Sequence, residues 1–184
     1  MAKHTTLAAA ILFMVGALSS GCSAATHRAT TVPLLTAAGI PLTATPTGAV
    51  PLEVITRSTA IADPLPVEGS DIYYADIEAA LGHAVSSATV PWAEVHREEQ
   101  HGGWALLVEI TQAHVAYVDG RMMVSFNVRA TLKTRVGNIY IAQTHANCRQ
   151  AGLIPDANGG GPIVYTCMTR IGRDINGWLG GLDV

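Results

Sequence analysis

The segment His96–His101, "HREEQH", holds the densest group of side chains that could carry out chemistry. Two histidines flank Glu98 and Glu99, which are residue types used in zinc sites and in acid–base pairs. A zinc-binding helix needs its histidines four positions apart, whereas these are five apart and would lie about 140° apart around a helix. In a strand, the odd offset would place them on opposite faces. We therefore interpret the segment as a charged loop, and an enzyme that uses it remains the alternative.

Other residues with chemical potential match no catalytic or metal-binding motif. His83, His114 and His145 stand singly in separate predicted elements. The segment "NGGGP", residues 158–162, lacks the Lys-Ser/Thr ending of a phosphate-binding loop. No serine has the surroundings of a nucleophile elbow. We expect no catalytic residue, no metal and no cofactor.

Cys22 follows a short apolar segment and precedes small polar residues, in "GALSSGCSAAT". Lys3 and His4 open the chain, an apolar run covers residues 7–18, and small residues follow, which is typical of a secretory signal peptide. The run is shorter than the roughly 20 apolar residues of a membrane-spanning helix. A buried helix is the alternative interpretation.

The residues around Cys22 also resemble the lipobox of bacterial lipoproteins, although Leu18 lies one position earlier than usual. The resemblance implies that Cys22 is acylated and becomes the first residue of the mature chain. Acyl chains hold a protein to a membrane by burying methylene groups, at about 0.8 kcal/mol each. Ser23 follows the cysteine, where an Asp would indicate retention at the inner membrane. We expect a bacterial envelope protein on the periplasmic side, with the outer membrane favoured over the inner.

Composition divides the chain into a signal peptide over residues 1–21, a tether over residues 22–50 and one domain over residues 51–184. The tether is rich in Ala, Thr and Pro and has almost no charge, which is typical of flexible or extended linkers. The formal net charge of the whole chain is −3. Neither sign clusters along the sequence, so nothing predicts the basic stripe of a nucleic-acid-binding protein.

Hydrophobic periodicity predicts three consecutive antiparallel strands. The segment "VSFNVRATL", residues 124–132, alternates apolar and polar residues without a break, so one face is buried and the other wet. Asp119-Gly120 predicts a tight turn before it, and Gly137-Asn138 marks the next turn. In the strand over residues 104–118 the apolar positions change parity near Gln112, which predicts a bulge at residues 111–112.

Two helices are expected to cover this meander. Ser70 is a candidate N-cap for a helix over residues 71–83, and Pro162 is placed to begin a helix that reaches Leu182. Further strands are expected over residues 52–62 and 89–96. The prediction is an α+β, two-layer sandwich: a four- to five-stranded, mostly antiparallel sheet with two helices packed on one face.

Cys148 and Cys167 test this arrangement, because each lies on the predicted inward side of its element. Two such thiols in an oxidising compartment are expected to form a disulfide, although both could be ordinary buried thiols. Trp92 is either a core residue or an exposed partner contact. On the wet face of the sheet, the candidate partner contacts are Asn127, Arg129, Gln143 and His145.

The order of these features resembles a known group of proteins. A candidate lipidated cysteine, a tether, a strand, a helix, the meander "WALLVEITQAHVAYVDGRMMVSFNVRATLKTRVGNIYIAQT" and a last helix ending "INGWLGGL" are similar to the auxiliary lipoproteins of ABC-type lipid transport systems. The lipopolysaccharide-assembly lipoprotein has a similar layout. The resemblance implies a non-enzymatic subunit, anchored by its lipid, that contacts a transporter or a lipid-carrier protein. A stand-alone binding module that uses the wet sheet face is a further alternative.

Overall fold

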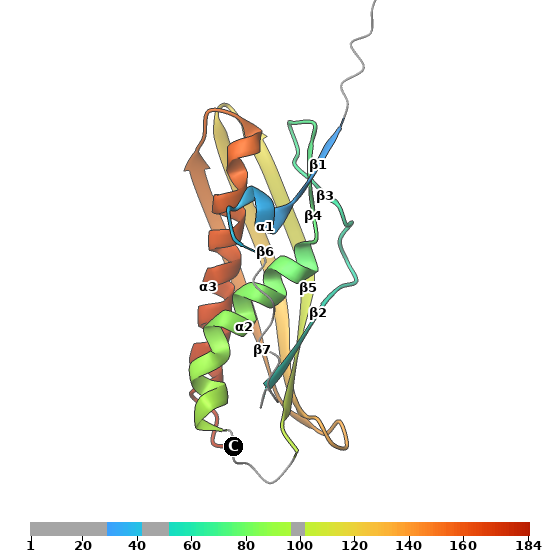
Figure 1. Ribbon diagram of the computed structural model, residues 1–184, viewed down its shortest axis with the longest axis vertical. Helices are drawn as coiled ribbons and strands as arrows, with labels where there is room; N and C mark the ends of the chain where they lie inside the picture. The colour runs from blue at the N-terminus through green and yellow to red at the C-terminus, as the bar shows by residue number, and fades with distance from the viewer. Residues whose placement is uncertain (1–28, 42–51, 97–101) are drawn as a thin grey trace, which may run out of the picture.

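The protein is described here from a computed structural model, over residues 29–41, 52–96 and 102–184 (Figure 1). The strands are β1 (Thr30–Pro33), β2 (Leu52–Ser58), β3 (Leu65–Pro66), β4 (Ile72–Ala75), β5 (Trp104–Val118), β6 (Arg121–Thr134) and β7 (Tyr140–Leu153). The helices are α1 (Leu34–Ala37), α2 (Ile77–Val95), the 3-10 turn η1 (Ala157–Gly160) and α3 (Gly161–Leu179). None of the helices in the described ranges has the length and apolar character that crossing a membrane would require.

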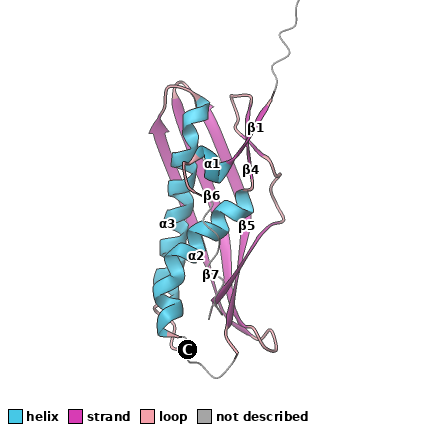
Figure 2. Ribbon diagram, in the orientation of Figure 1, coloured by secondary structure: helices cyan, strands magenta, loops and turns pink. Residues whose placement is uncertain are grey.

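The main sheet has the strand order β2-β5-β6-β7. The β5, β6 and β7 strands form the predicted antiparallel meander, whereas β2 joins the edge of β5 in parallel. Helices α2 and α3 both lie over one face of this sheet (Figure 2). The predicted α+β architecture with one covered face is therefore confirmed. A second, small sheet with the order β1-β4-β3 was not expected from the sequence.

The turns and the bulge of the meander form where the sequence predicts them. Asp119 and Gly120 both have positive φ, 50° and 74°, as a type I′ hairpin turn requires. The pairing of β5 with β6 shifts register between Ile110 and Gln112. This bulge restores the inward direction of the apolar side chains, because Ile110 and Val115 are both buried despite their odd separation.

The core lies between the helices and the covered face of the sheet. The stripe predicted for the last helix is buried at Val164, Cys167, Met168, Ile171 and Ile175. Helices α2 and α3 approach closely at Gly172, where an added Cβ would lie 2.8 Å from the backbone oxygen of Ala84. A glycine at this position thus permits a contact that any larger residue would obstruct.

The helix predicted over residues 71–83 is wrong in its position. Residues 72–75 form β4, which pairs in parallel with β1, and α2 begins only at Ile77. The Ser70 hydroxyl caps no helix; it accepts a hydrogen bond from the Ile72 amide at 3.2 Å and donates one to the Val67 oxygen at 3.1 Å. The run Ile-Tyr-Tyr favours a strand when a partner strand is available, and β1 supplies that partner.

The strand predicted over residues 89–96 is also wrong, because α2 continues to Val95. Pro91 lies inside the helix, where it removes one backbone donor. Thr89, Trp92 and Ala93 are nevertheless buried at helical spacing from Val85. Burial of this stripe against α3 offsets the lost hydrogen bond.

The tether predicted over residues 22–50 requires a correction at residues 29–41, while the rest of that range lies outside the described residues. Residues 30–33 pair with β4, and α1 follows directly. Leu34 is fully buried and Leu35 is 5% exposed. At the start of α3, a Cβ on Gly161 would lie 2.5 Å from the backbone carbonyl of Ala37, which shows how closely the two helices pack. Composition alone does not reveal this segment, because Thr, Pro and Ala are also common in linkers.

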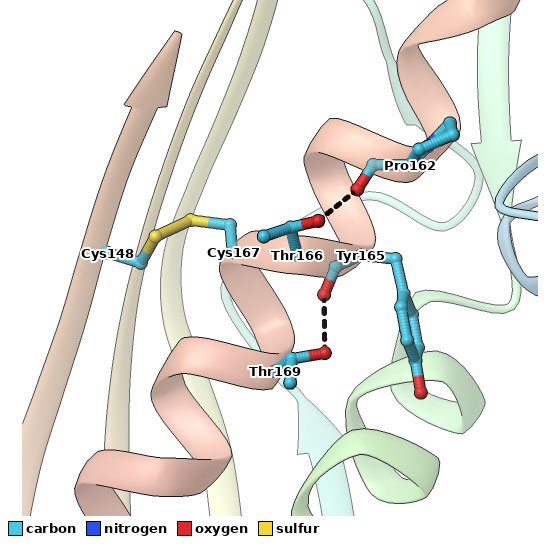
Figure 3. The surroundings of a disulfide bond; sticks show 6 residues. All are labelled: Cys148, Pro162, Tyr165, Thr166, Cys167 and Thr169. Atoms are coloured by element: carbon cyan, nitrogen blue, oxygen red, sulfur yellow. Dashed lines mark hydrogen bonds between the residues drawn. A yellow bond between two sulfur atoms is a disulfide. The ribbon is translucent and has the colours of Figure 1, made fainter. Parts of the chain in front are cut away.

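Cys148 and Cys167 form the predicted disulfide, which links β7 to α3 (Figure 3). Both residues are buried, with exposed fractions of 1% or less. The bond closes a loop with a sequence separation of 19 that contains η1 and the start of α3. The disulfide therefore fixes the last helix to the outer strand of the sheet.

Tyr74 is a buried polar residue between the small sheet and η1. Its hydroxyl donates a hydrogen bond to the Ala157 backbone oxygen at 3.2 Å. Burial, together with the nearby Asp156 carboxylate, raises the pKa of Tyr74 to about 12. The hydroxyl consequently stays protonated at neutral pH and connects β4 to the turn that begins α3.

Candidate functional site

The open sheet face is the side of β5, β6 and β7 that the helices leave uncovered. Residues on β6 alternate between the two faces, so Phe126 and Val128 are buried while Asn127 and Arg129 are half-buried on the open side. On β7, Gln143 and His145 are exposed. The structure thus places the four candidate contacts of the wet face on one surface.

A row of charged side chains crosses the middle of the open sheet face. Glu109, Arg129 and His145 are direct neighbours on β5, β6 and β7. The Arg129 Nε and Nη2 atoms lie 2.9 Å and 2.8 Å from Oε2 of Glu109. The Glu109 side chain is only 17% exposed, so this contact holds a partly desolvated carboxylate and keeps the guanidinium in place.

A second polar row lies beside the bulge. The Asn127 amide donates a hydrogen bond to the Gln112 side-chain oxygen at 2.6 Å. The Thr111 hydroxyl donates to the Asn127 backbone oxygen at 3.0 Å. At the bulge, the side chains of Thr111 and Gln112 on β5 therefore contact β6. Asn127 is oriented by a hydrogen bond from its side chain and by one to its backbone oxygen.

A shallow hollow of about 290 Å³ opens next to this row. Its lining residues come from the loop after β2, from the bulge and from β6: Ala60, Ile61, Thr111, Gln112, Ala113, His114 and Ser125. The imidazole Nε2 atom of His114 lies 3.2 Å from the Glu68 carboxylate, and both side chains are at least half exposed. The parity change in β5 predicts the bulge, but no sequence signal indicates that Ala60 and Ile61 would close one side of a hollow there.

Basic residues gather on the open sheet face. The four strands of the main sheet carry two glutamates and five basic residues: Arg57, Arg121, Arg129, Lys133 and Arg149. The register and the burial of their neighbours direct these five side chains away from the helices. The two glutamates, Glu53 and Glu109, lie on the same face, so five basic and two acidic side chains leave it a formal net charge of +3, whereas the whole chain has −3. Such a face attracts an acidic surface.

Trp92 belongs to the core, which corrects its assignment as a candidate partner contact. Its side chain is 5% exposed, and the indole Nε1 atom donates to the Leu179 backbone oxygen at 3.0 Å. The His96 ring stacks on this indole with centroids 4.2 Å apart, and His96 Nδ1 lies 2.9 Å from the Trp92 backbone oxygen. His96 therefore ends α2, whereas Glu98, Glu99 and His101 lie outside the described residues.

The other histidines occupy separate places. His83 on α2 has its Nδ1 atom 2.7 Å from the Tyr165 hydroxyl on α3, and burial raises the pKa of that hydroxyl. Figure 3 shows the Tyr165 ring directed from α3 towards α2. Across residues 29–41, 52–96 and 102–184, no three His, Cys, Asp or Glu side chains are grouped as metal ligands. Cys22 lies outside these ranges.

Comparison with known proteins identifies relatives of the fold rather than of the sequence. No protein-family model matches the chain, and no curated protein matches it. Protein XCC0632 from Xanthomonas campestris, described as belonging to family DUF330, has 14% sequence identity and a TM-score of 0.50. The match covers 75% of this chain and 89% of the other. At this identity the likeness is one of fold, and it agrees with the two-layer arrangement described above.

Two further structures match with lower scores. A Caulobacter crescentus protein described as a candidate lipoprotein has 12% identity and a TM-score of 0.45, over 71% of this chain and 88% of the other. Lipoprotein GNA1162 from Neisseria meningitidis has 11% identity and a TM-score of 0.32, over 65% of this chain and 96% of the other. Both of these structures are described as lipoproteins.

Proposed function

We propose that this protein is a non-enzymatic, lipid-anchored accessory subunit of an ABC-type lipid transport system in the bacterial envelope. Acyl chains on Cys22 would hold it on the periplasmic side, at the outer membrane rather than the inner. Its role would be to contact the transporter or a lipid-carrier protein through the open sheet face. The lipid that is transported is left undefined.

The observation that carries this proposal is the open sheet face. Three strands of 14 or 15 residues present aligned polar side chains on a side that no described helix covers. The Glu109–Arg129 and Gln112–Asn127 contacts hold part of that surface in a fixed arrangement. A preorganised polar surface loses little conformational entropy when a partner binds.

The amino-terminal pattern supports the anchoring part of the proposal. A charged start, an apolar run and small residues lead directly to Cys22. A thiol at that position suits lipidation better than catalysis, because it follows the small residues that precede a lipidated cysteine. Only seven residues, of the types Ala, Thr, Ser, His and Arg, separate it from β1. The fold shared with the DUF330 protein is compatible with this interpretation, although a fold does not determine a function.

A stand-alone binding module is the second candidate, and the hollow beside the bulge favours it. Its lining combines an imidazole, an amide and two hydroxyl groups with three apolar side chains, a mixture suited to a small polar ligand. In that case the open sheet face would bind its ligand without any transporter. Binding that persists in cells lacking the transporter would favour this candidate.

Cys22→Ala is expected to abolish lipidation. In cells supplied with labelled palmitate, the wild-type protein should carry the label and sediment with membranes, because its acyl chains are buried in a bilayer. The variant should carry no label. An unlabelled wild-type protein would contradict the anchoring and the accessory role together.

Gln143→Glu combined with His145→Glu is expected to weaken binding to the transporter at least tenfold. The two carboxylates add negative charge to a basic face, so they would repel an acidic partner surface. The measurement is co-purification with the ATPase, the permease and the lipid-carrier protein of the transport system proposed above. Arg173→Glu is the matched control, because it makes the same change in net charge at an exposed position on α3. Equal retention of the partners by both variants would exclude the open sheet face as the contact.

A further inference from the structure

Three large apolar side chains are exposed at the end of the open sheet face nearest the β5–β6 turn. Val118, Met123 and Leu153 have exposed fractions of 47%, 42% and 76%. Arg121 pairs with Val118 on one side and with Leu153 on the other. The side chains of Val118, Arg121 and Leu153 therefore form one row across the sheet. Met123 lies in the next row on the same face, because the intervening Met122 is buried. We call Val118, Arg121, Met123 and Leu153 the anchor-end patch.

The amino-terminal end of the described chain lies at this same end of the molecule. The Thr30 amide donates to the Asp71 backbone oxygen at 2.7 Å. In the same loop, the backbone of Glu68 accepts a hydrogen bond from the Tyr117 amide at 2.7 Å, one residue before Val118. Figure 1 shows β1 entering at the end where the β5–β6 turn lies, and the β6–β7 turn at the opposite end.

The chain between Cys22 and the folded domain is short. Seven Cα-to-Cα steps separate Cys22 from Ala29, and seven steps span at most about 25 Å even when fully extended. The 14 residues of β6 alone extend about 48 Å. Another exposed apolar group, Val136, Ile139 and Tyr140, lies at the β6–β7 end. That group therefore cannot be the sole contact with a bilayer that holds Cys22.

We propose that the anchor-end patch lies on the surface of the phospholipid bilayer that holds Cys22, an inference that depends on the anchoring proposed above. The patch begins beside the β5–β6 turn, and Met123 is three residues beyond Gly120. The apolar side chains of the patch therefore lie within about 10 Å of that turn. This matches the depth of about 5–10 Å to which apolar groups enter the headgroup region. The Arg121 guanidinium would contact lipid phosphates between the apolar side chains. The far end of the sheet would then project away from the membrane and be accessible to a protein partner.

The test uses the full-length protein, processed and lipidated in cells and reconstituted into vesicles of phosphatidylethanolamine and phosphatidylglycerol. Leu153→Cys and Ile139→Cys each introduce one thiol for an environment-sensitive dye, at exposed positions on opposite ends of the sheet. The Cys148–Cys167 disulfide leaves the native pair unreactive without reductant. Nitroxide-labelled lipids should quench the dye at position 153 several-fold more than the dye at position 139. Adding Val118→Asp and Met123→Asp should remove that quenching while the protein still floats with the vesicles.

Flotation separates the two proposals. A protein that floats while its dye at position 153 stays unquenched, or is quenched no more than the dye at position 139, overturns the membrane contact and leaves the anchor intact. A protein that does not float overturns both. If the dye at position 153 is shielded only after the transporter proteins are added, the patch binds protein instead, and the bilayer assignment is wrong.

Discussion

Leu34→Ala is expected to lower the free energy of unfolding by about 3 kcal/mol, within the range of 2–5 kcal/mol measured for buried leucines. Leu34 is fully buried where α1 meets α3, and its removal leaves a cavity that close-packed neighbours cannot fill. The measurement is urea-induced unfolding of the oxidised protein. A residue in a flexible tether would show no such effect.

Thr36→Ala is the control for this prediction. Thr36 lies two residues further along the same short helix, but it is exposed. Its substitution should change stability by less than about 0.5 kcal/mol. If the two variants were equally stable, residues 29–41 would not contribute to the fold. The chain between Cys22 and the domain would then extend to about residue 50, as the predicted tether does. The inferred position of the anchor-end patch at the membrane would then lose its main constraint.

The double variant Cys148→Ala/Cys167→Ala is expected to lose about 3 kcal/mol of stability. A closed loop with a sequence separation of 19 restricts the unfolded chain by roughly that amount in the chain-entropy model. Alanine is chosen because both positions are buried, and the hydroxyl of serine would need a hydrogen-bond partner there. The expected result is a lower urea midpoint for the variant than for the oxidised wild type.

Reduction of the wild-type protein provides the matching measurement. The reduced protein should unfold at a urea concentration close to that of the double variant, since both lack the same link between β7 and α3. A double variant as stable as the oxidised wild type would mean that the disulfide does not restrict the unfolded chain. Mass mapping under non-reducing conditions should recover Cys148 and Cys167 in one linked peptide pair.

The meander and the last helix could be predicted from the sequence because their signals are local. Strict alternation in β6, positive-φ turn residues at Asp119-Gly120 and the apolar stripe of α3 each follow from the geometry of a single element. The disulfide followed from the same local information, since alternation and helical spacing placed both cysteines on inward faces. The parity change near Gln112 likewise indicates the bulge from the residues of one strand alone, without its partner strand.

The elements that were predicted wrongly depend on partners far away in the sequence. Residues 72–75 become a strand because β1 pairs with them from more than 40 positions away. Residues 89–95 remain helical, despite Pro91, because Thr89, Trp92 and Ala93 are buried against the rest of the core. Local propensity is weak compared with the free energy of burying a side chain, so tertiary packing decides such segments.

The sequence by itself determined the candidate anchor at Cys22, the three long strands, the covering helix α3 and the disulfide, because each depends on residue type and period within one segment. Only the tertiary structure decided that residues 30–41 belong to the domain, that Trp92 is core and that basic residues share the open sheet face. Those properties depend on which segments, distant in the sequence, pair or pack together in the fold. The spacing of charges along a chain does not fix their separation in space until strands are paired in register.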